Sequence, residues 1–432
     1  DGDGRRYSVF IWSDPTGLSY TNTSRLGVME LTSPSARRSS RAPVWIPPRS
    51  GQGTELVAVV DADGKATITL HDAALQAALD RAEEGRVKLE VQGTENANAL
   101  SIVIPGHLMK NIVEADIAVI EIDAGIVIVE LPFSLLFIDD EKGEVILNVA
   151  RVDSDSLPAK VREKVGHYPV YELILLKNGD RITTFGANEY VRVSYPFSLS
   201  AGLRPAQIVI YHIADDDTMT VIKNGRYNAS TGNVEFLTNH FSYFTAIPVQ
   251  VHFTDLDQAA WAEDSIIALG ARGIVKGMTS DLYMPNQEVT RAEFVQMLVQ
   301  ALDLKAKASN HPFDDVKQGA WYESAILQAY QLGIVYGRDD GTFGVHDNIQ
   351  RQEMAVMTYR ALQAAGIDLK PSDAASELTD AAAIADYARE AVIAMHQAGI
   401  ISGMPDGSFA PKETATRAQA AVILNQLLNR LH

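Results

Sequence analysis

Three arginines occupy the same place in a pattern that recurs in the C-terminal part of the chain: Arg291, Arg351 and Arg417. In the first copy the run is Thr290-Arg-Ala-Glu293, where a threonine cap and a glutamate three residues later form a helix capping box. The arginine is then the first helical residue, where backbone N–H groups are free and the helix dipole is positive. Helix N-termini bind anions, and a guanidinium adds paired donors for a carboxylate or phosphate. The pattern predicts one anion site in each copy.

Aromatic, glycine and acidic residues recur in register with these arginines. The aromatic positions, spaced by 60 and 66 residues, are Trp261, Trp321 and Tyr387. The other positions are the glycines Gly273, Gly333 and Gly399, the glycines Gly277, Gly337 and Gly403, and, shifted by one residue in the third copy, the acids Asp255, Asp315 and Asp380. An aromatic ring offers a flat apolar face on which a sugar ring can stack. We therefore expect each copy to bind a ligand that is anionic and saccharide-like.

The elements that position these residues are predicted to be two helices in each copy, joined by a glycine turn and a loop. A glycine such as Gly273 supplies the left-handed residue that ends the first helix. The second helix carries an apolar stripe at helical spacing, as in Phe294, Met297, Leu298 and Ala301. Three equivalent helices with matching stripes predict a central three-helix bundle.

The three copies are not identical, so we expect unequal sites. Gln350 replaces the capping threonine in the second copy, and Tyr387 replaces tryptophan in the third. The first copy also lacks the Asp-Gly turn that the others have at Asp340-Gly341 and Asp406-Gly407.

Residues 55–249 are predicted to form a β-rich, sandwich-like module. The expected strands are Lys65–Leu70, Val87–Val91, Leu100–Ile104, Ile117–Ile122, Ile126–Leu131, Glu144–Val149, Tyr171–Leu176, Glu189–Val193, Gln207–Ile213 and Asn233–Leu237, with one helix over Asp72–Glu84. Two turns are explicit, at Asn178-Gly179 and Thr231-Gly232. A strand that ends in proline before a short turn or helix recurs at Pro105, Pro132 and Pro196, which favours related β-units in two packed sheets.

Charge and composition exclude several classes of protein. The net charge of −18 argues against nucleic acid as the main partner. Residues 1–50 carry +3, residues 51–250 carry −12 and residues 251–432 carry −9, so anion binding in the helical part must be focal. We expect residues 1–54 to be a linker or disordered tail. Acidic residues interrupt the most apolar stretch, from Ile112 to Ile138, and argue against a membrane span.

Neither a catalytic site nor a cofactor is predicted. The chain has no cysteine, and its ten histidines show no metal-ligand spacing. Neither a nucleophile elbow, a phosphate loop nor a dinucleotide fingerprint occurs. The calcium-like run at Asp61–Gly64 lacks the later ligands and predicts a hairpin turn, and Asp215–Asp217 predicts a solvated turn with a weak alternative as a calcium site.

The helical part resembles three tandem S-layer homology domains. The resemblance rests on Phe253-Thr-Asp255, Phe313-Asp-Asp315, Trp261, Trp321, Pro405-Asp-Gly-Ser-Phe409 and the Thr-Arg-Ala-Glu box. It implies a pseudo-trimer around a central three-helix bundle. It also implies that grooves between the repeats bind a secondary cell wall polymer with a pyruvylated sugar. In each groove the arginine would meet the acidic ketal, helped by the aromatic residue, the loop glycine (Gly277, Gly337 or Gly403) and the acid (Asp255, Asp315 or Asp380).

The resemblance predicts the organisation and location of the chain. We expect repeats over 250–309, 310–372 and 373–432, in a protein outside the cell, on the wall or in the S-layer of a Gram-positive-type bacterium, with self-association as a further possibility. The β-rich region resembles modules found beside such repeats, most clearly at Thr238–Phe244. Two hypotheses remain open: a non-enzymatic surface protein held by its repeats, or the anchoring end of a surface glycoside hydrolase whose catalytic domain lies upstream of Asp1.

Overall fold

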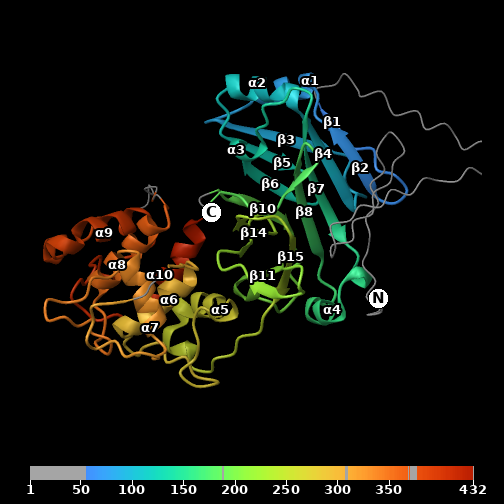
Figure 1. The fold of residues 1–432 in the computed structure, drawn as a ribbon. Coiled ribbons are helices and arrows are strands. Elements are labelled where there is room, and N and C mark those ends of the chain that lie inside the picture. Colours follow the sequence, from blue (N-terminus) through green and yellow to red (C-terminus); the bar gives the residue numbers. More distant parts are fainter. Residues whose placement is uncertain (1–54, 187–188, 307–309, 368, 370–376, 432) are drawn as a thin grey trace, which may run out of the picture.

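The computed structural model describes all residues except 1–54, 187–188, 307–309, 368, 370–376 and 432. The linker or tail expected over 1–54 therefore lies outside the described residues. The remaining chain forms a β-rich module and a helical region that lie side by side, as the green-blue and orange-red parts of Figure 1 show. A β-rich part followed by a helical part was expected from the sequence.

The β-rich module contains two sheets, as predicted. One sheet has the spatial order β1 (Leu56–Val57), β3 (Arg86–Gln92), β5 (Val119–Asp123), β6 (Ile128–Pro132), β10 (Val191–Pro196), β14 (Asn233–Thr238) and β13 (Arg226–Asn228). The other has the order β12 (Met219–Val221), β11 (Ile208–Ile213), β15 (Tyr243–Pro248), β8 (Val170–Lys177), β7 (Glu144–Val152), β4 (Ala99–Pro105) and β2 (Lys65–Thr69), with β9 (Asp180–Ile182) beside β8. The two sheets enclose one apolar core.

The repeated phrase in this module corresponds to a repeated β-helix-β connection. The short helices are α1 (Asp72–Leu79), α2 (Met109–Glu114), preceded by η1 (Gly106–Leu108), and α3 (Phe133–Leu136). From β2 to β3, and again from β4 to β5, the chain leaves the second sheet, passes through a helix and enters the first. Equivalent strands therefore run parallel, β2 beside β4 and β3 beside β5. Pro105 and Pro132 end their strands and precede a helix, where the missing N–H is tolerated.

All ten predicted strands are present, but several other elements were missed. The missed strands are β1, β9, β12, β13 and β15, and the missed helix is α4 (Ala159–Val165), whereas α2 and α3 lie where a short turn or helix was expected after Pro105 and Pro132. The helix predicted over Asp72–Glu84 ends at Leu79. The hairpin expected at Asp61–Gly64 is wrong, because this turn connects β1 and β2 in different sheets. The turns at Asn178-Gly179 and Thr231-Gly232 do connect paired strands, as does the Asp215–Asp217 turn.

The phrase Thr238–Phe244 forms the corner at which the chain passes from β14 in one sheet to β15 in the other. The Thr238 hydroxyl donates to the His240 carbonyl, and the Ser242 hydroxyl donates to the Ile213 carbonyl. Phe244 is fully buried and packs against Phe236. The recognisable residues of this phrase therefore have structural roles.

A pair of histidines makes this corner sensitive to acid. The rings of His212 and His240 lie 4.4 Å apart, and among the described residues the buried Nε2 of His240 has no hydrogen-bond partner. Burial, followed by the neighbouring His240, lowers the pKa of His212 to about 4, although Asp215 and Asp216 oppose the shift. Burial also lowers the pKa of His240. The folded module therefore favours neutral rings.

We expect the module to lose stability as the pH falls. A base with a lowered folded pKa contributes fully above its unfolded pKa, about 6.5 for histidine, and loses that contribution toward the folded pKa. Because the His212 ring is partly exposed, its titration is expected to lower the free energy of unfolding by only about 2 kcal/mol between pH 7 and pH 4. Urea unfolding at both pH values measures it. His212→Gln should reduce the pH dependence, and an equal dependence in both proteins would contradict the assignment.

The helical region contains the predicted pair of helices in each copy. The first helices are α5 (Glu263–Ala271), α7 (Glu323–Gln331) and α9 (Asp386–Gln397), and the second are α6 (Arg291–Ala301), α8 (Arg351–Ala364) and α10 (Arg417–Arg430). Short 3-10 turns lie at η2 (Ser154–Ser156) and η3 (Pro205–Gln207) in the β-rich module, and at η4 (Leu256–Ala262) and η5 (Ala381–Ala383) before the first helices of copies one and three. Gly273, Gly333 and Gly399 follow the first helices with φ of 67°, 70° and 67°, the left-handed conformation predicted for them.

The β-rich module packs against the first and third copies. Val209 and Tyr211 of β11 and Ile247 of β15 form an apolar cluster with Ala271 of α5. Around the cluster, Arg204 pairs with Asp264 at 2.7 Å and with Glu263, Lys223 donates to the Arg272 carbonyl, and Arg226 donates to the Asn429 carbonyl of α10 at 3.0 Å. Figure 1 shows the C-terminus at this contact. The two parts are thus held by apolar packing and by several cations.

Candidate functional site

The three copies contact each other in a closed cycle. The N–H of Val289 in copy one donates to the carbonyl of Ala415 in copy three at 2.9 Å. The N–H of Ala415 donates to the carbonyl of Ile349 in copy two at 2.9 Å, and the N–H of Ile349 donates to the carbonyl of Val289 at 3.0 Å. We name each contact region by two numbers: junction 1–2, junction 2–3 and junction 3–1. The first number is the copy that contributes the arginine, and the second is the copy whose groups accept hydrogen bonds from it. Glu288 also accepts from Asn348 and from Thr414, so all three copies meet at one carboxylate.

Each predicted arginine begins its helix at a junction, but its backbone N–H is not free. Arg291 donates to the Asp347 carbonyl, Arg351 to Glu413 and Arg417 to Gln287, at 2.9, 2.9 and 2.8 Å. The second N–H of α8, from Gln352, donates to Pro411. The expectation of free N–H groups at these helix starts is therefore wrong, because the loop of a neighbouring copy satisfies them. Any anion at these positions must be recognised by side chains.

The guanidinium groups are buried against the next copy. Their residues are 5%, 4% and 5% exposed for Arg291, Arg351 and Arg417. The Nε atoms donate to the carbonyls of Phe343, Phe409 and Tyr283 respectively, and each guanidinium lies over the ring of the same residue, at 4.9, 5.0 and 4.5 Å. A cation over an aromatic face is attracted by the ring quadrupole. The arginines thus connect the copies as well as facing a possible ligand.

The ionic partners of the arginines differ among the junctions. At junction 1–2, Arg291 pairs with Glu353 at 2.5 Å. At junction 3–1, Arg417 lies 3.9 Å from Glu293 and donates to the Lys276 carbonyl at 2.8 Å. Glu353 and Glu293 are the third residues of their helices, and the equivalent residue at junction 2–3 is Gln419. Among the described residues, Arg351 makes no salt bridge.

The predicted acids hold loops within their own copies. Asp255 accepts from the N–H groups of Tyr283 and Met284, and Asp380 accepts from those of Phe409 and Ala410. Asp315 accepts three, from Phe343, Gly344 and Val345. Each acid thereby holds in place an aromatic residue, Tyr283, Phe343 or Phe409, whose ring lies beneath an arginine. Partial burial raises the pKa of Asp315, but the three N–H donors outweigh it and hold that pKa below its ordinary value.

Asp315→Asn is expected to destabilise the helical region by about 1–2 kcal/mol, because an amide cannot accept from all three donors. Folding lowers the pKa of the Asp315 carboxyl below its unfolded value of 3.8. Its contribution to the free energy of unfolding is therefore present above pH 3.8 and disappears as the pH falls through the folded pKa. Urea unfolding at pH 7 and pH 3 measures both effects. The exposed neighbour Asp314 supplies the control Asp314→Asn, and an equal loss in both variants would contradict this role for Asp315.

The predicted aromatic residues lie at the surface. Trp261, Trp321 and Tyr387 are 63%, 61% and 57% exposed. Tyr387 lies within electrostatic range of junction 1–2: partial burial and Glu353 raise its pKa, and Arg291 and Arg360 lower it. This junction therefore contains an arginine from copy one, a carboxylate from copy two and an aromatic ring from copy three. The equivalent element contacts are α10 with η4, which carries Trp261, and α6 with α7, which begins two residues after Trp321.

The loop glycines Gly277, Gly337 and Gly403 are required for close packing. A Cβ at Gly277 would lie 2.4 Å from the Thr279 carbonyl oxygen, and one at Gly337 would lie 2.4 Å from the Phe313 ring. At Gly403 the nearest atom, the Ser408 carbonyl oxygen, would be 3.0 Å away. These contacts explain the glycines without a ligand.

Sequence reasoning missed the third helical residues Glu293, Glu353 and Gln419, and the rings beneath the arginines, Tyr283, Phe343 and Phe409. The first set was interpreted as capping residues, and each does accept from its cap backbone N–H at 2.8–3.1 Å. A second carboxylate oxygen of Glu293 and of Glu353 faces the arginine of another copy. The recurrence of these positions in register was the available signal. The arginine that faces Glu353 is 62 residues away along the chain, however, and the arginine that faces Glu293 is 124 residues away.

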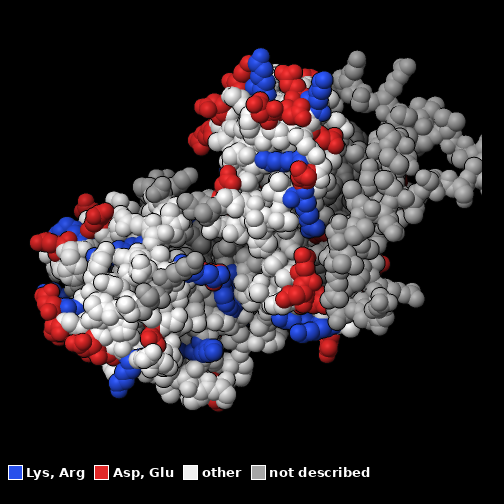
Figure 2. Space-filling view, in the orientation of Figure 1, with Lys and Arg blue, Asp and Glu red and all other residues white. Residues whose placement is uncertain are grey.

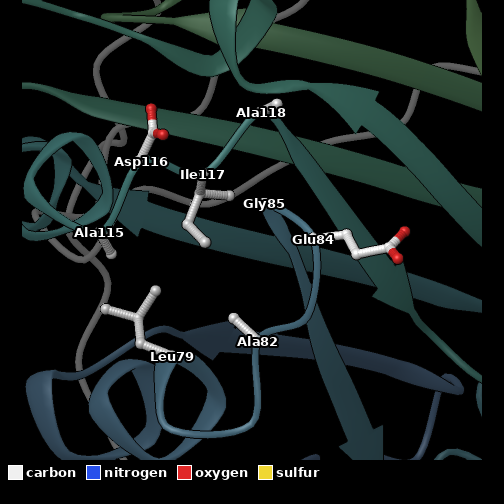
Figure 3. A pocket seen from close by; sticks show the side chains of 8 residues that line it. All are labelled: Leu79, Ala82, Glu84, Gly85, Ala115, Asp116, Ile117 and Ala118. Atoms are coloured by element: carbon white, nitrogen blue, oxygen red, sulfur yellow. The ribbon is translucent and has the colours of Figure 1, made fainter.

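The β-rich module contains a shallow cavity of about 450 Å³ between the α1–β3 and α2–β5 connections. The apolar side chains of Leu79, Ala82 and Ile117 line part of it, and Figure 3 shows the carboxylates of Glu84 and Asp116 directed away from each other. Within the described part of the chain, the side chains of His, Asp and Glu form no group that could hold a metal ion. The cavity therefore lacks a convergent set of polar groups.

Acidic side chains cover the outer ends of both parts of the molecule in Figure 2, at the top of the β-rich module and along the left rim of the helical region. Such a surface repels polyanions except where cations are concentrated. Each helix in the described ranges is too short or too polar to cross a bilayer.

The S-layer homology domain family matches residues 252–295, 312–355 and 377–421, and each match extends from just before the acid to just beyond the arginine. Residues 252–421 are three S-layer homology domains. S-layer homology domains anchor proteins to the cell wall, so this chain is an extracellular, cell-wall-associated protein, and its helical region is an anchoring and not a catalytic one.

Several curated proteins are similar to part of this chain. The chain is 34% identical over 265 residues to an amylopullulanase of Thermoanaerobacterium thermosulfurigenes, covering 60% of this chain and 14% of the relative. It is 41% identical over 180 residues to exoglucanase XynX of Acetivibrio thermocellus, with 42% and 16% covered, and 29% identical over 160 residues to a cellulosome-anchoring protein of that organism, with 36% and 35% covered. The chain thus spans about a seventh of the length of the two glycanases. The amylopullulanase alignment is longer than segment 252–432 and includes part of the β-rich module.

Proposed function

We propose that the three junctions bind an anionic secondary cell wall polymer, with a pyruvylated sugar as the group recognised. We further propose that the copies form a pseudo-threefold assembly around a central bundle of α6, α8 and α10. The closed cycle of backbone hydrogen bonds supports the assembly, because each copy donates to one neighbour and accepts from the other.

The observation that carries the proposal is junction 1–2, where the exposed ring of Tyr387 lies within electrostatic range of the buried Arg291, and the cycle of copies makes the other two junctions equivalent to it. A buried guanidinium over an aromatic ring is held in a fixed orientation, which suits two parallel hydrogen bonds to a carboxylate. A ring that is more than half exposed can stack on a sugar face. The ketal of a pyruvylated sugar offers a carboxylate beside a sugar ring, so one ligand can use both groups.

The proposed sites are focal positive positions on an acidic protein. The helical part carries −9 overall, so long-range attraction does not concentrate the polymer. Affinity must come from short-range contacts and from the presence of several sites on one chain. Binding that resists moderate salt is therefore expected.

Binding to purified Gram-positive cell walls tests the proposal, with walls from which the non-peptidoglycan polymer has been extracted as the control. Trp261→Ala and Trp321→Ala are expected to weaken binding about tenfold each, since a stacked ring contributes about 1–3 kcal/mol, without lowering the free energy of unfolding. Tyr190→Ala, at a 47% exposed ring of the β-rich module, is the matched control. Equal binding to extracted walls would overturn the polymer as the ligand.

A second proposal is that the chain is the anchoring part of a larger cell-surface glycoside hydrolase and contributes no catalytic group itself. It is supported by the amylopullulanase and exoglucanase names of two relatives, and by the alignment that includes part of the β-rich module. The reading frame that encodes residues before Asp1 is the direct test. A glycoside hydrolase domain there supports this proposal, whereas a secretion signal alone favours a surface or lattice protein.

A further inference from the structure

The junctions differ in one residue whose charge bears directly on anion binding. Glu353 and Glu293 lie within 4 Å of the arginines at junctions 1–2 and 3–1, so each of those arginines already has a carboxylate partner. A ligand carboxylate must compete with that partner or share the arginine with it. At junction 2–3 the equivalent residue is Gln419, which is isosteric with glutamate and uncharged.

Arg351 consequently has unused donors. Its Nε donates to the Phe409 carbonyl at 2.7 Å, and this is its one side-chain hydrogen bond among the described residues. The two terminal nitrogens of Arg351 have no hydrogen-bond partner among the described residues, and they are not fully buried. Both nitrogens therefore reach solvent. Burial lowers the pKa of Arg351, opposed by the more distant charges of Glu413 and Asp380. A buried cation without an ion pair gains more from an incoming anion than one already paired.

The equivalence of the copies assigns an aromatic residue to the same junction. Tyr387 lies near Arg291 and Glu353 at junction 1–2, on the first helix that packs against α8. The equivalent first-helix segment beside α10 is η4, which carries Trp261 with 63% of its surface exposed. Junction 2–3 thus combines the unpaired arginine with a tryptophan, whereas junction 1–2 combines a paired arginine with a tyrosine.

We infer that junction 2–3, with Arg351, Gln419 and Trp261, is the strongest of the three sites for a carboxylate-bearing sugar. Gln419 is the residue that sets this preference, by leaving Arg351 without an internal counter-ion. The inference rests on the proposed function and adds an order among the sites that it describes.

Exchanges between glutamate and glutamine test the inference with little change of shape. In the full chain, Gln419→Glu is expected to weaken binding of the methyl glycoside of pyruvylated N-acetylmannosamine about tenfold at the strongest site, by supplying Arg351 with a counter-ion. Glu353→Gln should create a second site of similar affinity by releasing Arg291. Titration calorimetry reads the number of sites and their affinities. The sugar without pyruvate is the control ligand.

Helix stability separates a loss of binding from a loss of folding. Glutamate at the third helical position favours the N-terminus, so Gln419→Glu should keep or slightly raise the melting temperature. If the unchanged chain binds and Gln419→Glu binds equally well, the inference is overturned while the proposed function stands. If the unchanged chain does not bind the pyruvylated sugar, pyruvyl recognition fails, and the inference fails with it.

Discussion

Gly337→Ala is expected to lower the free energy of unfolding of the helical region by about 2–4 kcal/mol. Gly337 has a φ of 77°, which costs a residue with a side chain about 1 kcal/mol. A Cβ there would lie 2.4 Å from one ring carbon of Phe313 and 2.9 Å from the Thr342 carbonyl oxygen, and overpacking of this kind costs a further 1–3 kcal/mol. Phe313 belongs to the core of the repeats, so its ring cannot move freely.

Gly319→Ala is the matched control. Gly319 lies in the same copy with a φ of 75°, but a Cβ would meet no atom within 4 Å. The control should lose only the conformational term, about 1 kcal/mol. Urea unfolding followed by tryptophan fluorescence measures both variants. Equal losses would show that the contact with Phe313 does not explain the glycine, and would return Gly337 to the list of ligand-binding candidates.

Two arginines between the β-rich module and the repeats are expected to respond in opposite directions to the same substitution. Burial lowers the pKa of Arg272 to about 10, with a smaller effect from Arg226, and its buried Nε has no partner among the described residues. Its one side-chain hydrogen bond, to Asn425, is long at 3.4 Å. Replacing a poorly paired buried charge by an apolar side chain of similar length is often stabilising. Arg272→Met should therefore raise the free energy of unfolding by about 1 kcal/mol.

Arg226→Met should lower the free energy of unfolding by about 3 kcal/mol. Arg226 donates twice to the buried Glu235, at 2.9 and 3.0 Å, and once to the Asn429 carbonyl. Removing one partner of such a pair leaves a buried carboxylate with less compensation. Thermal unfolding of the two variants beside the unchanged chain measures both effects. A loss at Arg272 as large as that at Arg226 would contradict the assignment of Arg272 as an uncompensated charge.

Local signals explain which parts of the fold could be predicted. Thr290, Thr416 and the residues that follow them satisfy a helix start through short-range hydrogen bonds, so those helices begin where the sequence indicates. The ten predicted strands are β-branched runs bounded by turn residues. Some alternate buried and more exposed side chains, as β3 does from Arg86 to Gln92, and others are buried over several consecutive residues, as β11 is from Ile208 to Tyr211. The turn or helix expected after Pro105 and after Pro132 is helical in both places, and helix α4 was missed because its seven residues give only a short helical pattern.

Long-range contacts explain what the sequence could not predict. Nothing within a few residues of Arg291 indicates that its N–H will meet the Asp347 carbonyl or that its guanidinium will be buried over the ring of Phe343. The same holds for Arg417 and Tyr283, which are 134 residues apart. The site positions could be found by their recurrence, but their burial and pairing depend on which copies become neighbours. For that reason the charge difference at Gln419 has meaning only once the cycle of copies is known.

The contact between Arg226 and the end of α10 bears on how this anchor carries mechanical load. A pull on the β-rich module reaches the repeats through the covalent chain at Val249–Val251, in the first copy, and through Arg226 and the Asn429 carbonyl, in the third. These two copies are neighbours across junction 3–1. We therefore expect a pull on the β-rich module to act on both the first and the third copy, on the two sides of the junction where the cycle closes, and not on one copy alone.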